Sequence, residues 1–247
     1  MQILLASAKI MTGTCERALP CISYPAFQSQ AYDLAIQLSR YTAEELQHVL
    51  KVDRRIAELN RMRFHSFFDE SLRQSAVFRY DGMVFQKLAP ETWTDDELVY
   101  ANSHLFVASF MYGLLRPLDR INSYRLEGNV VLPGNGYRSM FDYWKPLLTD
   151  WFIATVKADD GVFVNLASNE FRHLFDWKRV TRELTVVTPE FKVMKEGRLK
   201  TIVIYAKMCR GAMAKWMIRN RVTDVSSLEK FEYEGFCHEQ NMSFVLR

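Results

Sequence analysis

The pattern of apolar and polar positions changes along the chain, from helical spacing in the first half to short apolar runs in the last third. Residues 3–7 form a short apolar run that predicts a buried strand, and 10–25, with its Gly and Pro residues, predicts a surface loop. Apolar positions in 28–68 recur at helical spacing. Thr42, with a glutamate three positions later, predicts a capping box that divides this region, and a further break is predicted near Asp53.

The middle of the chain predicts a mixture of elements. The Val-, Phe- and Tyr-rich segment 76–88 predicts a strand and a turn, continued by a strand or a helix. Thr94 is followed by three acidic residues, which suit the first turn of a helix, and this helix is expected to run to about Met111 and end at Gly113. The amphipathic, aromatic segment 139–157 predicts another helix.

The last third alternates between short strands and helices. The predicted helices begin at Ser168 and cover 206–221. The predicted strands are 162–165, 184–187, 201–205, 231–236 and 243–246. Late alternation with early helices indicates an α/β fold, in which helices surround a mixed sheet, and we expect one domain over residues 1–247.

Composition narrows the class of protein. Apolar residues make up 49% of the 247 residues, which is enough for a continuous core. The four cysteines form no C-x-x-C pair and no apolar run approaches the roughly 18 residues of a membrane span, so we expect a cytoplasmic protein with reduced thiols and no membrane partner. The five histidines show no metal-binding spacing, and no P-loop or G-x-G-x-x-G occurs, so the sequence predicts no metal site and no cofactor.

Three predicted strands are each followed at once by polar or basic residues. If these strands are parallel neighbours, their carboxyl ends meet at one edge of the sheet, where open α/β sheets bind ligands. Helices that begin there also direct free N–H groups outward, so the predicted ligand is an anion such as a phosphate. The residues concerned are Lys9 after the first strand, Asn165, Ser168 and Glu170 after the second, and Tyr205, Lys207 and Arg210 after the third.

Simpler interpretations stand beside this one. Ser168 as a helix N-cap, with Glu170 in the first turn, explains both residues without a ligand. Lys207 and Arg210 are also compatible with the exposed face of an amphipathic helix. At about 100° per residue, however, both share one sector with Arg221, and such a basic stripe can follow a phosphate backbone.

The segment 109–119 contains a predicted tight reversal at Gly113 and Pro117. A hairpin between two helical pieces would expose backbone N–H groups together with Arg116, which could hold a DNA phosphate without reading sequence. The alternative is a turn with a buried Tyr112. Further on, Arg125 and Glu127 alternate in a predicted strand and are expected to pair on one face.

These motifs, taken in order, resemble the YaaA-like peroxide-stress family over residues 1 to about 246. The resemblance is carried by Ala8-Lys9, Tyr112-Gly113-Leu114-Leu115-Arg116-Pro117-Leu118-Asp119, Tyr124-Arg125-Leu126-Glu127, Asn165-Leu166-Ala167-Ser168-x-Glu170, Tyr205-Ala206-Lys207-x-x-Arg210-Gly211 and Glu234-Gly235-Phe236. It implies a compact α/β architecture with a helix-hairpin-helix element, which we assign to 109–119. It also implies a cytoplasmic protein that binds DNA and protects the cell from peroxide by limiting unincorporated iron.

The sequence departs from the family pattern at two places. The family's Ser-Pro-Ala-Lys start is replaced by Ala6-Ser7-Ala8-Lys9, and its Gly-Asp-Val-Tyr by Gly82-Met83-Val84-Phe85, so an acid and a phenol are missing. Proton transfer or metal contact by those groups is therefore not expected here, whereas the Lys and Arg positions remain.

Two functional hypotheses follow. The first is a non-enzymatic stress protein that binds DNA, or another phosphate-bearing ligand, in a basic cleft. The second is an enzyme acting on a nucleotide, RNA or another phosphate-bearing substrate at the strand ends, with Lys9, Ser168, Glu170, Lys207 and Arg210 as candidate groups. Direct iron binding is the weakest hypothesis, because the sequence offers no cluster of His, Cys and carboxylate side chains.

Overall fold

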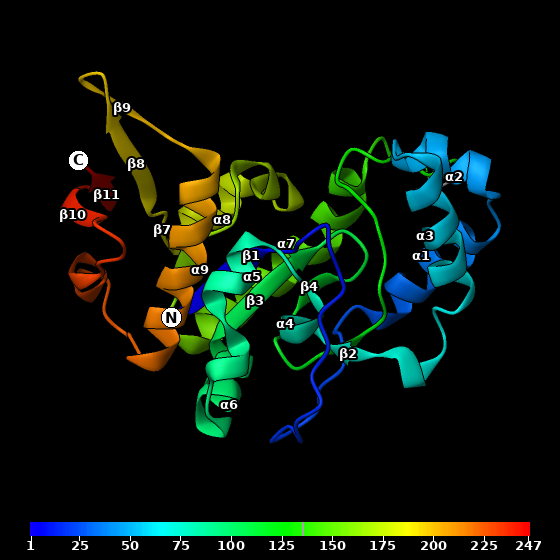
Figure 1. Ribbon diagram of the computed structural model, residues 1–247, viewed down its shortest axis with the longest axis horizontal. Helices are drawn as coiled ribbons and strands as arrows, with labels where there is room; N and C mark the ends of the chain where they lie inside the picture. The colour runs from blue at the N-terminus through cyan, green and yellow to red at the C-terminus, as the bar shows by residue number, and fades with distance from the viewer. Residues whose placement is uncertain (135) are drawn as a thin grey trace.

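A five-stranded mixed sheet lies at the centre of the protein (Figure 1). The structure, a computed structural model, describes residues 1–134 and 136–247. The order of the central strands is β4-β3-β1-β6-β7, in which β4 alone runs antiparallel to its neighbour. These strands are β1 (Gln2–Ala6), β3 (Leu105–Ser109), β4 (Gly113–Leu115), β6 (Val162–Asn165) and β7 (Thr185–Val187).

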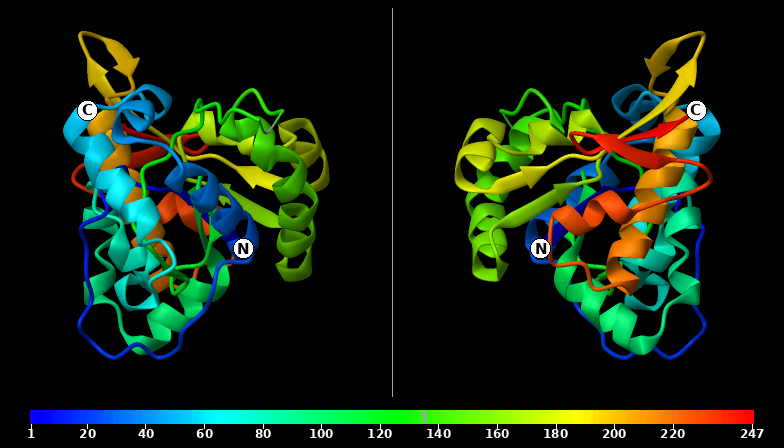
Figure 2. Two further views of the ribbon diagram at one scale, coloured as in Figure 1. Left: turned by 90° about the vertical axis from the view of Figure 1, so that its right-hand side faces the viewer. Right: turned by 90° about the vertical axis from the view of Figure 1, so that its left-hand side faces the viewer.

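A second sheet has the order β10-β11-β8-β9 and lies at one end of the molecule, opposite the end formed by α1, α2 and α3 (Figure 1). The hairpin β8–β9 projects from the body of the protein (Figure 2). The strands of this sheet are β8 (Glu190–Lys195), β9 (Arg198–Lys200), β10 (Cys237–Gln240) and β11 (Ser243–Leu246), and a separate pair is formed by β2 (Gln74–Ser75) and β5 (Arg120–Ile121).

Helices surround the central sheet, as the alternation of the sequence predicted. The α-helices are α1 (Gln28–Ser39), α2 (Ala43–Leu50), α3 (Arg54–His65), α4 (Ala76–Arg79), α5 (Met83–Leu88), α6 (Asp95–His104), α7 (Met140–Asp159), α8 (Trp177–Glu183) and α9 (Val203–Arg219). Short 3-10 helices are η1 (Glu70–Leu72), η2 (Pro90–Thr92), η3 (Asn169–Leu174) and η4 (Ser226–Lys230). Among the described residues, no helix combines the length and the apolar character needed to cross a membrane.

Local sequence signals set several helix boundaries correctly. The predicted capping box at Thr42 is present, and a second one at Thr94 starts α6. Asp53 accepts a hydrogen bond from the Ile56 N–H and starts α3, which confirms the predicted break. Each cap satisfies backbone donors that the helix itself leaves unpaired, so these boundaries depend only on nearby residues.

The packing of α9 against α5 depends on one glycine. A Cβ atom at Gly211 would lie 2.1 Å from the backbone oxygen of Val84, so only glycine permits this approach. The neighbouring Ala212 and Ala214 are also small and buried. Because α9 carries Lys207 and Arg210, this contact also fixes where these cations stand.

Some predicted elements are wrong. The helix predicted to continue to Met111 stops at His104, and the next five residues form β3 instead. In the segment 76–88 the predicted strand is a short helix, α4, whereas the helix that was one of the two alternatives after the turn is present as α5. The predicted strand 201–205 contains the first turn of α9, and 231–236 makes only an isolated bridge. Short apolar runs fit a buried strand or a buried helix equally well, so the tertiary contacts decide.

The helix-hairpin-helix assigned to 109–119 is also wrong. This segment contains the last residue of β3, the turn after it and all of β4, and in these two antiparallel strands Val107 lies opposite Leu115. The predicted reversal at Gly113 is confirmed, since its φ is +72° and a Cβ there would approach the Trp144 ring to 2.8 Å. The hairpin is therefore part of the central sheet.

Candidate functional site

A cleft of about 500 Å³ lies at the carboxyl ends of β1 and β6. Its walls come from the segments after these two strands, from the start of α5, from the loop after β5 and from α9. The parallel pairing of β1 with β6 confirms that the segments after the two strands meet at one edge of the sheet. The cleft includes the predicted residues Lys9, Arg125, Glu127, Ser168, Glu170, Lys207 and Arg210.

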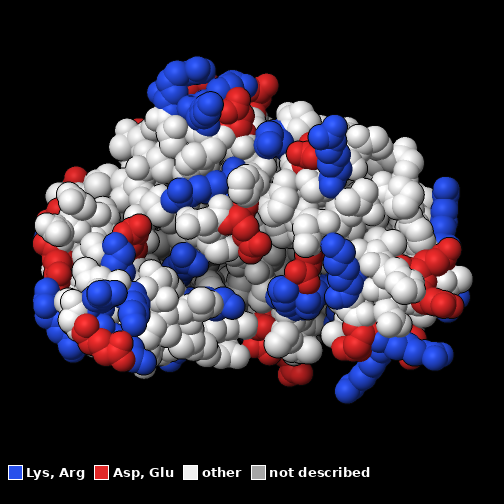
Figure 3. Space-filling view, turned by 90° about the horizontal axis from the view of Figure 1, so that it is seen from above, with Lys and Arg blue, Asp and Glu red and all other residues white. Residues whose placement is uncertain are grey.

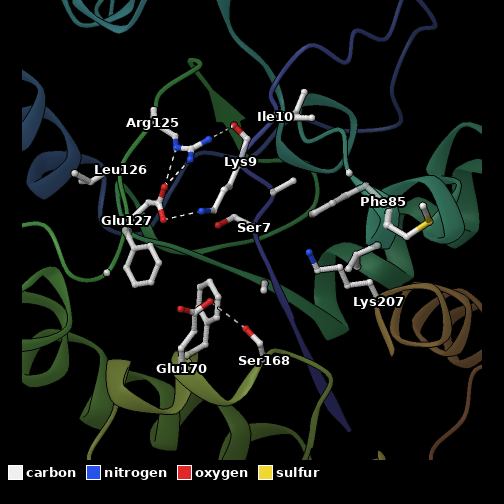
Figure 4. A pocket seen from close by; sticks show the side chains of 18 of the residues that line it. Ser7, Lys9, Ile10, Phe85, Arg125, Leu126, Glu127, Ser168, Glu170 and Lys207 are labelled. Atoms are coloured by element: carbon white, nitrogen blue, oxygen red, sulfur yellow. Dashed lines mark hydrogen bonds and ion pairs between the residues drawn. The ribbon is translucent and has the colours of Figure 1, made fainter. Parts of the chain in front are cut away.

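On one side of the cleft, two cationic side chains form ion pairs with the same carboxylate (Figure 4). Lys9 Nζ lies 2.8 Å from Glu127 Oε2, and Arg125 Nη2 lies 2.6 Å from Glu127 Oε1. The predicted pairing of Arg125 with Glu127 is thus confirmed, although no strand forms there. Partial burial acts to raise the pKa of Glu127, but the hydrogen bonds from Lys9 and Arg125 outweigh it and lower that pKa.

The opposite side is formed by α9 (Figure 4). Lys207 is exposed and Arg210 is half-buried, and neither makes an ion pair or side-chain hydrogen bond with any residue the structure describes. Burial alone lowers the pKa of Arg210, with no neighbouring carboxylate acting against it. A half-buried guanidinium without a partner is unfavourable unless another group supplies the negative charge.

Ser168 stands at the N-cap of η3, yet its side chain does not cap the helix. Its hydroxyl lies 3.3 Å from Glu170 Oε1 and donates to that carboxylate at the edge of the cleft. The capping interpretation is therefore correct for the position of Ser168 but wrong for its side chain.

Arg116 lies outside the cleft, at the opposite edge of the sheet. Its Nη1 donates to Gln2 Oε1 at 2.9 Å and to the backbone oxygen of Leu105 at 3.4 Å, at the amino ends of β1 and β3. Its guanidinium also lies 3.5 Å from the centre of the Phe106 ring. The prediction that Arg116 shares a site with Lys9 is wrong, because hydrogen bonds and ring contacts fix it within the protein.

The remaining predicted residues make contacts within the protein and lie outside the cleft. Tyr112 is buried, as the alternative interpretation held, and its hydroxyl accepts the Asn122 N–H at 3.0 Å. Asn165 is buried, and its Oδ1 accepts the Ala167 N–H. Tyr205 lies in the first turn of α9 next to the Phe236 ring. Like Gly113, these residues do not line the cleft.

The predicted stripe on α9 is only partly present. Lys207 and Arg210 both line the cleft, but Arg221 lies beyond the last residue of α9 with a φ of 46°. Its guanidinium lies 5.2 Å from the centre of the Tyr100 ring. The two cations therefore belong to a local cleft rather than to a stripe along the whole helix.

Sequence reasoning missed part of the lining. Ser7, Met83 and Phe85 line the cleft, together with the aromatic side chains Phe110, Tyr124, Phe141 and Phe171. Met83 and Phe85 are positions at which the sequence departs from the family pattern, and this signal could have found them. Ser7 also departs from that pattern and, in addition, stands directly after β1, where polar residues were expected. Seen from above, the protein is hollowed near its centre, with Lys and Arg side chains at the edges of the hollow (Figure 3).

The cleft is lined by a third carboxylate, and its acidic residues form no metal-binding cluster among the residues that the structure describes. Besides Glu127 and Glu170, Asp81 lines the cleft, and it accepts hydrogen bonds from Thr12 and Gln86. Within residues 1–134 and 136–247, no group of three or more His, Cys, Asp or Glu side chains is placed to hold a metal ion.

Together, the fold and the cleft define an α/β protein with basic side chains gathered at the carboxyl ends of two parallel strands. Residues 1–242 match the family model described as "Peroxide stress protein YaaA", and the chain belongs to this family. UPF0246 proteins of Bacteroides fragilis and Phocaeicola vulgatus are 47% and 46% identical over 244 residues, covering 98% of this chain and 95% and 96% of the relatives. A UPF0246 protein of Clostridium beijerinckii is 32% identical, covering 98% of this chain and 94% of the relative.

Proposed function

We propose that this member of the peroxide stress family binds a phosphate-bearing ligand, with DNA as the expected partner, in the basic cleft. Binding there would shield DNA from iron-driven peroxide damage, and any effect on iron would be indirect. The proposal is supported by the family membership and by the cations that line the cleft. The cytoplasmic location expected from the sequence is part of the same proposal.

The observation that carries this proposal is the contrast between the charges in the cleft. The three carboxylates that line it already accept hydrogen bonds from neighbouring side chains: Asp81 from Thr12 and Gln86, Glu127 from Lys9 and Arg125, and Glu170 from Ser168. Lys207 and Arg210 have no such partners among the residues that the structure describes. The two cations of α9 that line the cleft therefore lack a partner, and a phosphate oxygen would satisfy both side chains.

A DNA-binding titration at several salt concentrations tests the proposal. Each phosphate held by a cation releases counterions, so the logarithm of the association constant should fall linearly with the logarithm of salt concentration. Lys207→Ala and Arg210→Ala should each weaken binding by roughly tenfold at low salt and reduce the slope by about 0.9.

Lys178→Ala is the matched control, because Lys178 is exposed on α8 and does not line the cleft. It should leave affinity and slope close to those of the unchanged protein. Affinity that does not depend on salt, or cleft variants that bind like the control, would contradict the proposal.

The helix-hairpin-helix element implied by the family needs another place in the chain. We assign it to α2 and α3, which pack together and are joined by residues 51–53, with Lys51 at a φ of 53°. Arg55 and Arg61 on α3 are exposed and could contact a backbone phosphate. If this assignment is correct, Arg55→Ala should lower DNA affinity in addition to the effect of Lys207→Ala.

The enzymatic alternative has weaker support. It requires a group in the cleft that gains and loses a proton during the reaction. Glu127 is held in its ionised form by Lys9 and Arg125, which lowers its pKa and makes it a poor base. Turnover of a nucleotide or RNA that Lys207→Ala abolishes would favour this alternative over simple binding.

A further inference from the structure

The β8–β9 hairpin extends beyond the body of the protein and ends in charged residues (Figure 2). Residues 195–200 are all exposed, whereas Phe191, near the start of β8, is buried. At about 3.3 Å per residue, Lys195 lies about 13 Å along the strand from Phe191. The tip therefore stands away from the core, and core packing does not explain its side chains.

The charges of this hairpin are only partly balanced by one another. Its carboxylates are paired with lysines of the same hairpin: Lys192 Nζ lies 2.6 Å from Glu190 Oε2, and Lys200 Nζ lies 3.3 Å from Glu196 Oε2. Lys195 and Arg198 have no ion pair or side-chain hydrogen bond with any residue that the structure describes. The unpaired charge at the tip is therefore positive.

The two unpaired cations lie directly opposite each other. Lys195 on β8 is the register partner of Arg198 on β9, so both side chains leave the hairpin on the same face. Like charges in this arrangement are destabilising, so the pair by itself weakens the hairpin. Charges on an edge strand deter pairing with other chains, but this explains only Arg198, because β8 is not an edge strand of its sheet. An anionic ligand would remove the repulsion.

The chain passes from this hairpin directly to the cleft. Two residues separate β9 from α9, and no charged residue lies between Lys200 and Lys207, which lines the cleft. The chain from Arg198 to Val203 spans at most about 18 Å, and Lys207 lies about 6 Å further along α9. The Cα atoms of Arg198 and Lys207 are therefore within about 24 Å of each other.

A DNA duplex is long enough to contact both places at once. It carries one phosphate per about 1.7 Å of its axis, so about 24 Å of duplex presents on the order of 14 phosphates. The hairpin rises at the top of the molecule in Figure 1, and the hollowed surface in Figure 3 is seen from that side. A phosphate ion held in the cleft, in contrast, would not contact Lys195 or Arg198, since neither lines the cleft.

We propose that the β8–β9 hairpin is a second DNA contact, in which Lys195 and Arg198 bind backbone phosphates of a duplex that also contacts the cleft. This inference rests on the proposed function, which supplies DNA as the partner, and adds a binding surface outside the cleft. Phosphate contacts carry no sequence information, so the hairpin adds affinity and fixes the direction of the duplex without selecting a sequence.

The composition of the tip favours DNA over an anionic lipid surface. Residues 195–198 are three charged residues and a glycine. The exposed Leu199 pairs with Met194, and both lie on the face opposite to that of Lys195 and Arg198. Segments that bind a membrane surface bury apolar side chains in it, and the tip of this hairpin offers none.

Duplex DNA and inorganic phosphate, titrated in parallel, test the hairpin separately from the cleft. Lys195→Ala and Arg198→Ala should each weaken binding of a duplex of about 20 base pairs roughly threefold at low salt and reduce the salt slope by about 0.9, because one phosphate contact is lost. Neither variant should change the affinity for inorganic phosphate, which reaches only the cleft. Lys207→Ala should weaken the binding of both ligands.

Lys192→Ala is the matched control, because it removes one positive charge from the same hairpin. Lys192 is paired with Glu190 and its side chain lies on the face opposite to that of Lys195. The control should bind the duplex like the unchanged protein. Equal losses in Lys192→Ala and Arg198→Ala would mean that only the total charge matters, and the assigned face would be wrong.

Lys195→Glu separates binding from folding. The new carboxylate would lie opposite Arg198 and form a cross-strand ion pair, so the melting temperature should not fall. Duplex affinity should nevertheless fall about tenfold, since a contact to phosphate becomes a repulsion. Duplex affinity equal to that of the unchanged protein would contradict the proposal.

The remaining outcomes separate this proposal from the proposed function. If the hairpin variants bind the duplex like Lys192→Ala while Lys207→Ala loses both ligands, the hairpin assignment is wrong and the cleft remains. If the hairpin variants lose DNA while Lys207→Ala binds both ligands normally, the hairpin is a DNA contact and the cleft proposal is wrong. An unchanged protein that binds no duplex overturns both.

A lipid partner would give a different result. Co-sedimentation with vesicles of phosphatidylcholine and phosphatidylserine in equal parts is measured for the same variants. Vesicle binding that Lys195→Ala and Arg198→Ala abolish, together with unchanged DNA affinity, would assign the hairpin to a membrane surface and overturn the proposal.

Discussion

Two arginines at opposite edges of the central sheet show how partners decide the role of a side chain. Arg116, at the amino ends of β1 and β3, donates to Gln2 Oε1 and rests on the Phe106 ring. Arg210, at the carboxyl edge, lines the cleft and has no side-chain partner among the described residues. Burial lowers the pKa of both, that of Arg116 to about 10, so burial alone does not separate them.

The difference lies in what surrounds each guanidinium. Around Arg116, Asp119 and Asp159 act to raise the pKa against the effect of burial, whereas no such charge acts on Arg210. A cation that the protein itself satisfies stabilises the fold, while an unsatisfied one is available to a ligand. The comparison therefore predicts separate effects on stability and binding at the two edges.

The largest expected effect comes from the contact that places Arg210. In Gly211→Ala the new methyl group would collide with the Val84 backbone, so α9 would have to move away from α5. We expect the free energy of unfolding to fall by about 3 kcal/mol. DNA affinity should fall as well, because Lys207 and Arg210 move with the helix. Urea denaturation and DNA titration measure both, and a loss of stability with unchanged affinity would break the link between α9 and the cleft.

A smaller effect is expected at the amino edge. Arg116→Met keeps an unbranched, flexible side chain but removes the hydrogen bonds to Gln2 and Leu105 and the contact of the guanidinium with the Phe106 ring. The free energy of unfolding should fall by about 2 kcal/mol, measured in urea, and DNA affinity at a temperature where the variant is folded should not change. A loss of DNA binding without a loss of stability would show that Arg116 is part of the binding site after all.

The smallest effect on stability is expected for Glu127, the carboxylate that forms ion pairs with both Lys9 and Arg125. The pKa of Glu127 in the folded protein is below its ordinary value of 4.5, so its contribution to stability is present above that pH and is lost as the pH falls through the folded pKa. Glu127→Gln should therefore lower the free energy of unfolding at pH 7 by less than about 1 kcal/mol, since the pair is partly exposed.

The same variant sharpens the comparison between paired and unpaired cations. In Glu127→Gln, Lys9 and Arg125 lose their carboxylate partner, so phosphate affinity at pH 7 should rise a few-fold. The stability difference from the unchanged protein should disappear at a pH well below the folded pKa of Glu127. A difference that persists there, or a lower phosphate affinity, would show that Glu127 does not offset these cations.

Much of the site could be predicted because strand ends are visible in the sequence. The residues after β1 and β6 were expected to meet, and the parallel pairing of these strands brings Lys9 and Ser168 to one cleft. Arg116 was misplaced because its motif lies in a hairpin of the central sheet, which was predicted to be helical. The family pattern supported its importance but not its location.

The sequence by itself determined the features that depend on neighbouring residues: the capped starts of α2, α3 and α6, the reversal at Gly113, and the family to which the chain belongs. Tertiary structure decided whether apolar runs such as 105–109 and 201–205 form a strand or a helix, because a buried strand and a buried helix have similar compositions. It also decided which cations keep a partner, since the fold brings Gln2, Leu105 and the Phe106 ring to Arg116, whereas Arg210 has no side-chain partner among the described residues.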